Sequence, residues 1–131
     1  MTRIHVRFHE LDPYGHVNHA VFLHWFEQAR VDLLEDLGVG LPRLARLGFQ
    51  LVVVRVDVRF LRAVVAGDEL VVHSDVVELR RASSRWHQTL TRGDEVVATN
   101  DLRSAVTDLD GHPRRAPRAL VDALESLSAT G

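Results

Sequence analysis

A single long helical pattern, followed almost entirely by strand patterns, is the feature that most constrains the fold of this chain. Between Asn18 and Leu37 apolar residues recur at three- and four-residue steps, and Gly38 and Gly40 then end the pattern. The apolar positions are Val21, Phe22, Trp25, Phe26, Ala29, Leu33, Leu34 and Leu37. Because this stripe is wide and aromatic, we expect the helix to be covered on more than one side.

Strand patterns fill most of the remaining sequence. They cover residues 3–9 before the helix, and 50–62, 70–79, 84–91 and 96–109 after it, and 117–127 predicts a short amphipathic helix. Strands that follow one another through short turns form an antiparallel sheet, and the apolar face of that sheet needs a cover. We therefore predict an α+β fold: a curved antiparallel five-stranded sheet wrapped around one long central helix, in a single domain of residues 1–131.

Alternation within two of these strands predicts which side chains face inward. In the first strand, Ile4, Val6 and Phe8 are predicted to lie on the buried face. In 50–62, one face is predicted to hold Val52, Val54, Val56, Val58 and Phe60, and the other Arg55, Asp57 and Arg59.

Composition excludes several classes of function. The formal net charge is −2, from 16 basic and 18 acidic residues, so we expect no nucleic-acid partner. There is no cysteine, which excludes disulfides and thiolate chemistry. No stretch reaches about 18 apolar residues, and the first residues lack the apolar core of a signal peptide. We predict a cytoplasmic protein without a membrane partner.

The turn between the first strand and the helix carries the strongest indication of chemistry. Asp12 precedes a helix start, where the first backbone N–H groups lack partners and the helix dipole favours negative charge. Gly15 lets a substrate carbonyl approach the backbone closely. One short turn can therefore supply a base or nucleophile together with an oxyanion hole. A thioester suits this turn, because its departing thiol has a pKa of about 8.5 and leaves without a strong acid.

Two segments resemble a known family. The run FHELDPYGHVNHAVFLHWFEQAR (8–30) resembles the signature of the 4-hydroxybenzoyl-CoA thioesterase-like branch of the hotdog superfamily. It is also similar to long-chain acyl-CoA thioesterases and plant acyl-ACP thioesterases, whose helices open with D-x-x-x-H-V-N-N. The run VDVRFLRAVVAGDEL (56–70) resembles a strand junction of the same family. The sequence departs from the pattern at His19, where Asn is commoner, and at Phe22, where Tyr is common.

The resemblance implies an acyl-CoA or acyl-carrier-protein thioesterase that needs no cofactor. It implies a homodimer or a tetramer of dimers, with active sites at the subunit interface. Asp12 would be the general base or nucleophile, and the amides of Gly15, His16 and Val17 would polarise the thioester carbonyl. Supporting roles would fall to His16, Asn18 and Glu27, and substrate binding to Tyr14, His19, Arg59 and Arg62.

Each of these residues also has a purely structural interpretation. Asp12 can be a turn former, and Asn18 the N-cap of the helix. Glu27 can be solvated or paired with Arg30. Arg59 and its neighbours Arg55 and Arg62 can hold CoA phosphates, or can form a solvated strand face with ion pairs to Asp57 and Asp75.

The site has three alternative interpretations: a metal site, a hydratase or dehydratase, and a non-catalytic binding module. His16, His19 and His24 suggest a metal, but a hydrolytic metal site needs a third ligand and an ordered outer shell, so we predict none. A hotdog hydratase or dehydratase would act on the same thioester, although it usually carries its carboxylate on the helix rather than before it. A non-catalytic thioester-binding module is the remaining alternative.

Overall fold

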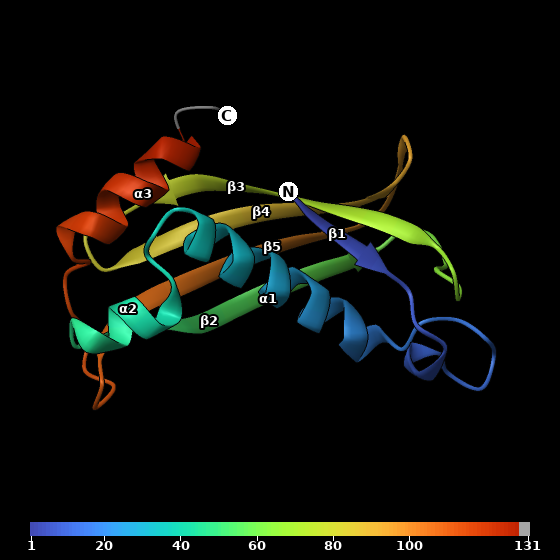
Figure 1. The fold of residues 1–131 in the computed structure, drawn as a ribbon, viewed down its shortest axis with the longest axis horizontal. Coiled ribbons are helices and arrows are strands. Elements are labelled where there is room, and N and C mark those ends of the chain that lie inside the picture. Colours follow the sequence, from blue (N-terminus) through green and yellow to red (C-terminus); the bar gives the residue numbers. More distant parts are fainter. Residues whose placement is uncertain (129–131) are drawn as a thin grey trace.

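The computed structural model describes residues 1–128 and contains five strands, three α-helices and one 3-10 turn. Their order is β1 (Thr2–His5), η1 (Phe8–Glu10), α1 (His19–Asp36), α2 (Leu41–Arg46), β2 (Phe49–Phe60), β3 (Glu69–Leu79), β4 (Ser83–Arg92), β5 (Glu95–Asp108) and α3 (Arg118–Ser128) (Figure 1). The strands form one antiparallel sheet in the order β1-β3-β4-β5-β2, so β1 and β2 are its edges.

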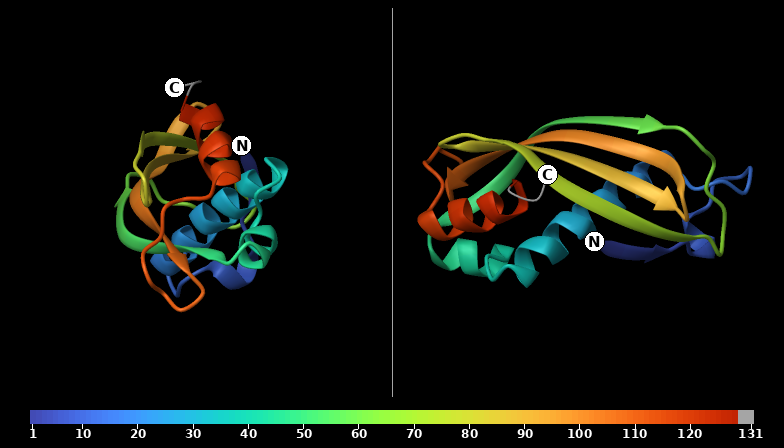
Figure 2. Two further views of the ribbon diagram at one scale, coloured as in Figure 1. Left: turned by 90° about the vertical axis from the view of Figure 1, so that its left-hand side faces the viewer. Right: turned by 90° about the horizontal axis from the view of Figure 1, so that it is seen from above.

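The sheet curls around α1, which lies on its concave face (Figure 2). This arrangement confirms the predicted architecture of a curved five-stranded antiparallel sheet around one long helix. The helix at the C-terminal end, predicted over 117–127, is confirmed as α3.

Both ends of α1 are formed by the residues that the sequence indicated. Asn18 is the N-cap, and its side-chain oxygen accepts a hydrogen bond from Ala20 N–H at 2.9 Å. At the other end Gly38 adopts a positive φ of 77°, which costs a residue without Cβ little. The N–H groups of Gly38 and Val39 then donate to the carbonyls of Glu35 and Leu34, at 3.0 and 2.9 Å. Local sequence therefore decides the length of this helix.

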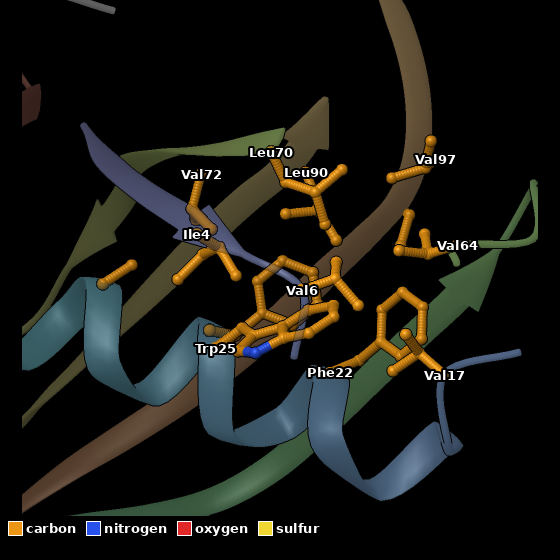
Figure 3. Packing of buried hydrophobic residues seen from close by; sticks show 13 residues of the cluster. Ile4, Val6, Val17, Phe22, Trp25, Val64, Leu70, Val72, Leu90 and Val97 are labelled. Atoms are coloured by element: carbon orange, nitrogen blue, oxygen red, sulfur yellow. The ribbon is translucent and has the colours of Figure 1, made fainter. Parts of the chain in front are cut away.

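The apolar core has two parts, one beneath each half of α1. The first part surrounds Phe22 and Trp25 of α1: Trp25 lies beside Ile4 and Val6, and Phe22 lies beside Val17 and Val64 (Figure 3). Its buried residues are Ile4, Val6, Val17, Phe22, Trp25, Phe26, Ala29, Val64, Leu70, Val72, Leu90, Val97 and Ala98. The second part contains Leu34, Leu44, Trp86 and Leu102 and is closed by Leu120 and Leu124 of α3. The first part holds the beginning of α1 against the sheet.

The first strand is shorter than predicted. β1 ends at His5, and Phe8 lies in η1 with 85% of its surface exposed, so the prediction that Phe8 faces the core is wrong. The reason is a local hydrogen bond: the Glu10 carboxylate accepts from Arg7 N–H at 2.7 Å, and Glu10 N–H donates back to Arg7 O. This side-chain capping competes with continuation of the strand.

A bulge in β2 overturns part of the predicted face pattern. The register with β5 shifts between Val53 and Arg55, so Val54 is the extra residue. Val56, Val58 and Phe60 pair with the inward-facing Leu102, Asn100 and Ala98, as the alternation predicted. Val52 instead pairs with Ala105 and lies on the outer face, because one inserted residue reverses the alternation.

One short helix, α2, was not predicted from the sequence. α2 begins after Gly40, with Pro42 in its first turn, and buries Leu44 completely. Pro at the start of a helix was the available signal, since its fixed φ suits that position.

Candidate active site

The loop that leads into α1 is a closed turn. Leu11 and Val17 form an isolated antiparallel bridge at its base. Inside it, Asp12 N–H donates to His16 O at 2.6 Å, and Gly15 N–H donates to Asp12 O at 3.0 Å. Gly15 has a φ of 79°, and a Cβ there would meet nothing within 4 Å, so backbone conformation rather than space favours glycine. The turn therefore presents Asp12 on a fixed backbone.

The carboxylate of Asp12 points into the turn. Its Oδ1 accepts hydrogen bonds from Tyr14 N–H at 2.8 Å and from His16 N–H at 3.1 Å. The side chain is half-buried, and among the described residues its second oxygen, Oδ2, has no hydrogen-bond partner. One oxygen thus orients the group and the other remains able to accept a proton or to attack a carbonyl.

The three amides predicted to polarise the substrate all have acceptors within the chain. Gly15 N–H donates to Asp12 O, and Val17 N–H donates to Val64 O at 2.9 Å. His16 N–H donates to the Asp12 carboxylate, which is the one acceptor of the three that belongs to a side chain. Across residues 1–128, no acceptor is recorded for His19 N–H, at the first position of α1. The sequence pattern did not distinguish this amide from its neighbours.

His19 also forms the aromatic wall beside the turn. Its ring stacks on Phe60 of β2 with centroids 4.5 Å apart, and Phe60 meets Phe22 edge-on at 5.0 Å. Phe60 keeps 43% of its surface exposed. The start of α1 and the end of β2 therefore stack two rings together at the residue whose N–H is free.

The other predicted substrate-binding residues are not gathered at this wall. Tyr14 is 86% exposed and extends from the turn. Arg59 pairs with Thr99 on the outer face of the sheet, opposite to the face of Phe60. Arg62 lies beyond the end of β2 and its Nε is 3.5 Å from Glu95 Oε2. Asn18 is occupied as the helix cap, which confirms its structural interpretation.

Glu27 lies further along α1, away from the Asp12 turn. It lines a cavity of about 360 Å³ beneath α1, beside Arg30, Leu34 and Trp86. Burial lowers the pKa of the Arg30 guanidinium, and the negative charge of Glu27 opposes that effect. The structure therefore places Glu27 next to Arg30, with no recorded contact to the Asp12 turn.

The sequence patterns did not predict the buried polar network that lies beside this cavity. Arg30 donates to Gln88 Oε1 at 2.9 Å, and Gln88 Nε2 donates to Phe26 O at 2.9 Å and Ser74 Oγ at 3.0 Å. Asn100 also donates to Gln88, while its own Oδ1 is buried without a partner. The available signal was a polar residue at an inward position of a strand, Gln88 between Trp86 and Leu90.

Among the described residues, the one group of three possible metal ligands is Asp108, Asp110 and His112. The Asp108 carboxylate is already held by the N–H groups of Asp110 and His112, both at 2.9 Å, and by Arg114 at 2.8 Å. This group is therefore explained as the closure of the turn that follows β5. His16, His19 and His24 do not converge with other ligands in such a group.

A curved five-stranded antiparallel sheet around one long helix is the hotdog fold. Residues 6–125 match the model of the thioesterase-like superfamily, and the chain belongs to this family. It is 33% identical over 110 residues to the long-chain acyl-CoA thioesterase FadM of Escherichia coli, a match that covers 82% of this chain and 83% of FadM.

Two further similarities support the same assignment. A putative esterase of Synechocystis is 32% identical over 87 residues, which is 66% of this chain but only about half, 52%, of that protein. The crystal structure of a Thermus thermophilus thioesterase complexed with coenzyme A and Zn superposes with a TM-score of 0.83 at 34% identity. That superposition covers 98% of this chain and 93% of the other.

Within residues 1–128, none of the helices combines the length and the apolar character needed to cross a membrane.

Proposed function

We propose that this protein hydrolyses acyl thioesters of coenzyme A or of a carrier protein to the free acid and thiol. Its family membership and its similarity to FadM support that reaction class. The observation that carries the proposal is the meeting of the Asp12 carboxylate with backbone N–H groups of the turn that precedes α1, at 3.1 Å in the case of His16.

In the proposed reaction Asp12 acts through its second oxygen, Oδ2. It either removes a proton from the attacking water or attacks the thioester carbonyl itself, and water then hydrolyses the acyl-enzyme. Both routes form an oxyanion on the former carbonyl oxygen. The free N–H of His19, at the positive end of the helix dipole, supports stabilisation of that charge. The N–H of His16 can join it where the substrate oxygen replaces Asp12 Oδ1 as acceptor.

The acyl group would lie against the aromatic wall of His19 and Phe60, which is next to the free amide. In this proposal Tyr14, Arg59 and Arg62 contact more distant parts of the substrate. Glu27 and Asn18 keep supporting roles, Asn18 by fixing the start of the helix. The cytoplasmic location stays a prediction from the sequence.

We propose that the protein is a homodimer that pairs through the free edge of β2. β2 carries an exposed apolar row along this edge of the sheet, of which Val53, Val54 and Val56 are 45, 55 and 45% exposed. An apolar edge strand with unpaired backbone groups favours pairing with another strand, and a second copy of β2 supplies one of equal length. Pairing there would cover Phe60 and the side of the proposed site nearest to it.

The substitution Asp12→Asn tests the reaction. Asparagine keeps an oxygen that can accept from Tyr14 and His16 N–H, so the turn is expected to persist, but the amide is neither a base nor an effective nucleophile. Thiol release from short, long and aromatic acyl-CoAs is expected to fall by at least about a hundredfold. Retained turnover would reject the role of Asp12. Hydration of an enoyl-CoA without thiol release by the natural chain would instead favour the hydratase.

A further inference from the structure

The convex face of the sheet, on the side away from α1, carries its charged residues in rows that cross the strands (Figure 2). The strand register places the members of each row directly opposite one another. One row, here named the arginine row, consists of Arg55, Arg103 and Arg85 on β2, β5 and β4. The next row, two residues along each strand, is named the aspartate row and consists of Asp57, Asp101, His87 and Asp75.

Both rows bring like charges together. Arg103 lies opposite Arg55 on one side and opposite Arg85 on the other, and Asp57 lies opposite Asp101. Like charges directly opposite one another destabilise a sheet. The convex face therefore needs compensating charge from elsewhere.

The chain itself supplies only part of that compensation. Arg85 Nε lies 3.3 Å from Glu78 Oε2, and His87 Nδ1 lies 2.9 Å from Asp101 Oδ1. The two rows are about 7 Å apart along the strands, and within residues 1–128 no ion pair joins one row to the other. Over the same residues, no side-chain ion pair or hydrogen bond is recorded for Arg55, Arg103, Asp57 and Asp75.

The surface around the rows is open to a partner. The rows border a hollow of about 250 Å³, which has Arg103 and Asp101 in its lining. Short side chains flank the rows on both sides: Thr89 lies opposite Thr99 beyond the aspartate row, and Ser83 lies opposite Ala105 beyond the arginine row. Because these side chains are short, another surface can approach the charged rows closely.

The alternation of the two rows indicates what kind of partner fits. A partner of a single charge would be attracted by one row and repelled by the other. A fitting partner carries both charges, in parallel rows about 7 Å apart. A second copy of this chain has that pattern, and half a turn about a line between the rows brings the two sheets face to face and exchanges the rows.

We propose that the convex face binds the convex face of a second copy of this chain, with the arginine row of each copy on the aspartate row of the other. Arg55 then lies opposite Asp57 of the second copy, and Arg103 opposite its Asp101. This contact is isologous and closes on itself. It leaves the free edge of β2 uncovered, so together with the proposed pairing of β2 it would build a tetramer.

Two charge reversals on β5 test the proposal by sedimentation velocity. Arg103→Glu places two acidic rows against each other and Asp101→Arg two basic ones, so each variant alone should associate at least about tenfold more weakly than the natural chain. Mixing the two variants restores opposite charges at both positions, so the mixture should associate as the natural chain does. The matched controls are Arg46→Glu and Asp94→Arg, which make the same changes of charge at exposed positions on α2 and in the β4–β5 turn.

Salt provides the second measurement. Raising the ionic strength from about 0.1 M to about 1 M shortens the Debye length from about 10 Å to about 3 Å and should weaken this association. The proposal is overturned if the natural chain and both variants have the same mass, or if the mixture does not reassociate. Both variants leave β2 unchanged and should keep the dimer that pairs through its edge, so the two interfaces can fail independently.

Discussion

The Oδ1 atom of Asp12 accepts a hydrogen bond from the backbone N–H of His16 at 3.1 Å. The residue proposed for catalysis is therefore also the residue that shapes the turn presenting it. From the sequence alone, Asp12 could be either a turn former or a catalytic group. The structure makes the two roles compatible, because Oδ1 accepts the hydrogen bonds of the turn and Oδ2 remains free for chemistry.

The dual role of Asp12 predicts different effects of two substitutions. Asp12→Asn keeps an acceptor for Tyr14 and His16 N–H and should change the free energy of unfolding by less than about 0.5 kcal/mol. Asp12→Ala removes the acceptor and should destabilise by about 1 kcal/mol. Both should lose thioester hydrolysis. Urea unfolding followed by circular dichroism measures the difference, and equal destabilisation of the two variants would contradict a structural role for Oδ1.

The cap of α1 predicts a loss of stability at Asn18. Asn18→Ala removes the acceptor for Ala20 N–H and should lower the free energy of unfolding by about 1 kcal/mol. Asn18→Ser retains a capping oxygen and serves as the control. Thermal unfolding of both variants checks this, and the expectation fails if serine and alanine prove equally destabilising.

The buried network predicts a larger effect at Gln88. Gln88→Leu would leave Arg30 and the carbonyl of Phe26 without their partner, at a cost of about 2–4 kcal/mol. Gln28→Leu is a matched control, because Gln28 is exposed on α1, and it should change stability by less than about 0.5 kcal/mol. Denaturant midpoints of the two variants measure the difference. A Gln88 variant as stable as the Gln28 variant would mean that the network adds no stability.

The edge of β2 predicts the oligomeric state. Val54→Lys places a charge at the bulge on the free edge and should convert the proposed dimer to a monomer. Val77→Lys is the control, since Val77 is also a bulge residue, 51% exposed, but lies on β3, which β4 and β5 separate from β2. Sedimentation velocity gives the mass of each variant. Persistence of a dimer in the Val54 variant would exclude this edge as the interface.

The hydrogen bonds of the Asp108 carboxylate predict that the stability of the fold decreases in acid. The backbone N–H of His112 most strongly lowers the pKa of the Asp108 carboxyl, with further contributions from Asp110 N–H and the Arg114 charge. A carboxyl with a lowered pKa in the folded state stabilises the fold above its unfolded value of about 3.9. That stability is lost as the pH falls through the folded-state pKa. Melting temperatures between neutral pH and strong acid should therefore fall less steeply in Asp108→Asn, and identical slopes would refute this contribution.

Much of the candidate site could be predicted from the sequence, because the turn is formed by residues that are close together in the chain. Asp12, Gly15 and Asn18 lie within a few residues of the groups that they bind, so the residue types themselves indicate a turn and a helix start. The family resemblance named the same turn. The availability of each amide was not predictable, because Val17 N–H is taken by Val64, which lies 47 positions further along the chain.

The sequence alone determined the elements whose causes lie within a few residues: both ends of α1, and the hairpin order that makes the sheet antiparallel. Tertiary structure decided everything that depends on register or on distant partners. The bulge at Val54 reverses which valines face inward, Gln88 meets Arg30 across the core, and Arg55 lies opposite Arg103. The physical reason is that alternation and capping act between neighbours, whereas pairing of distant strands is set by the packing of the whole sheet around its helix.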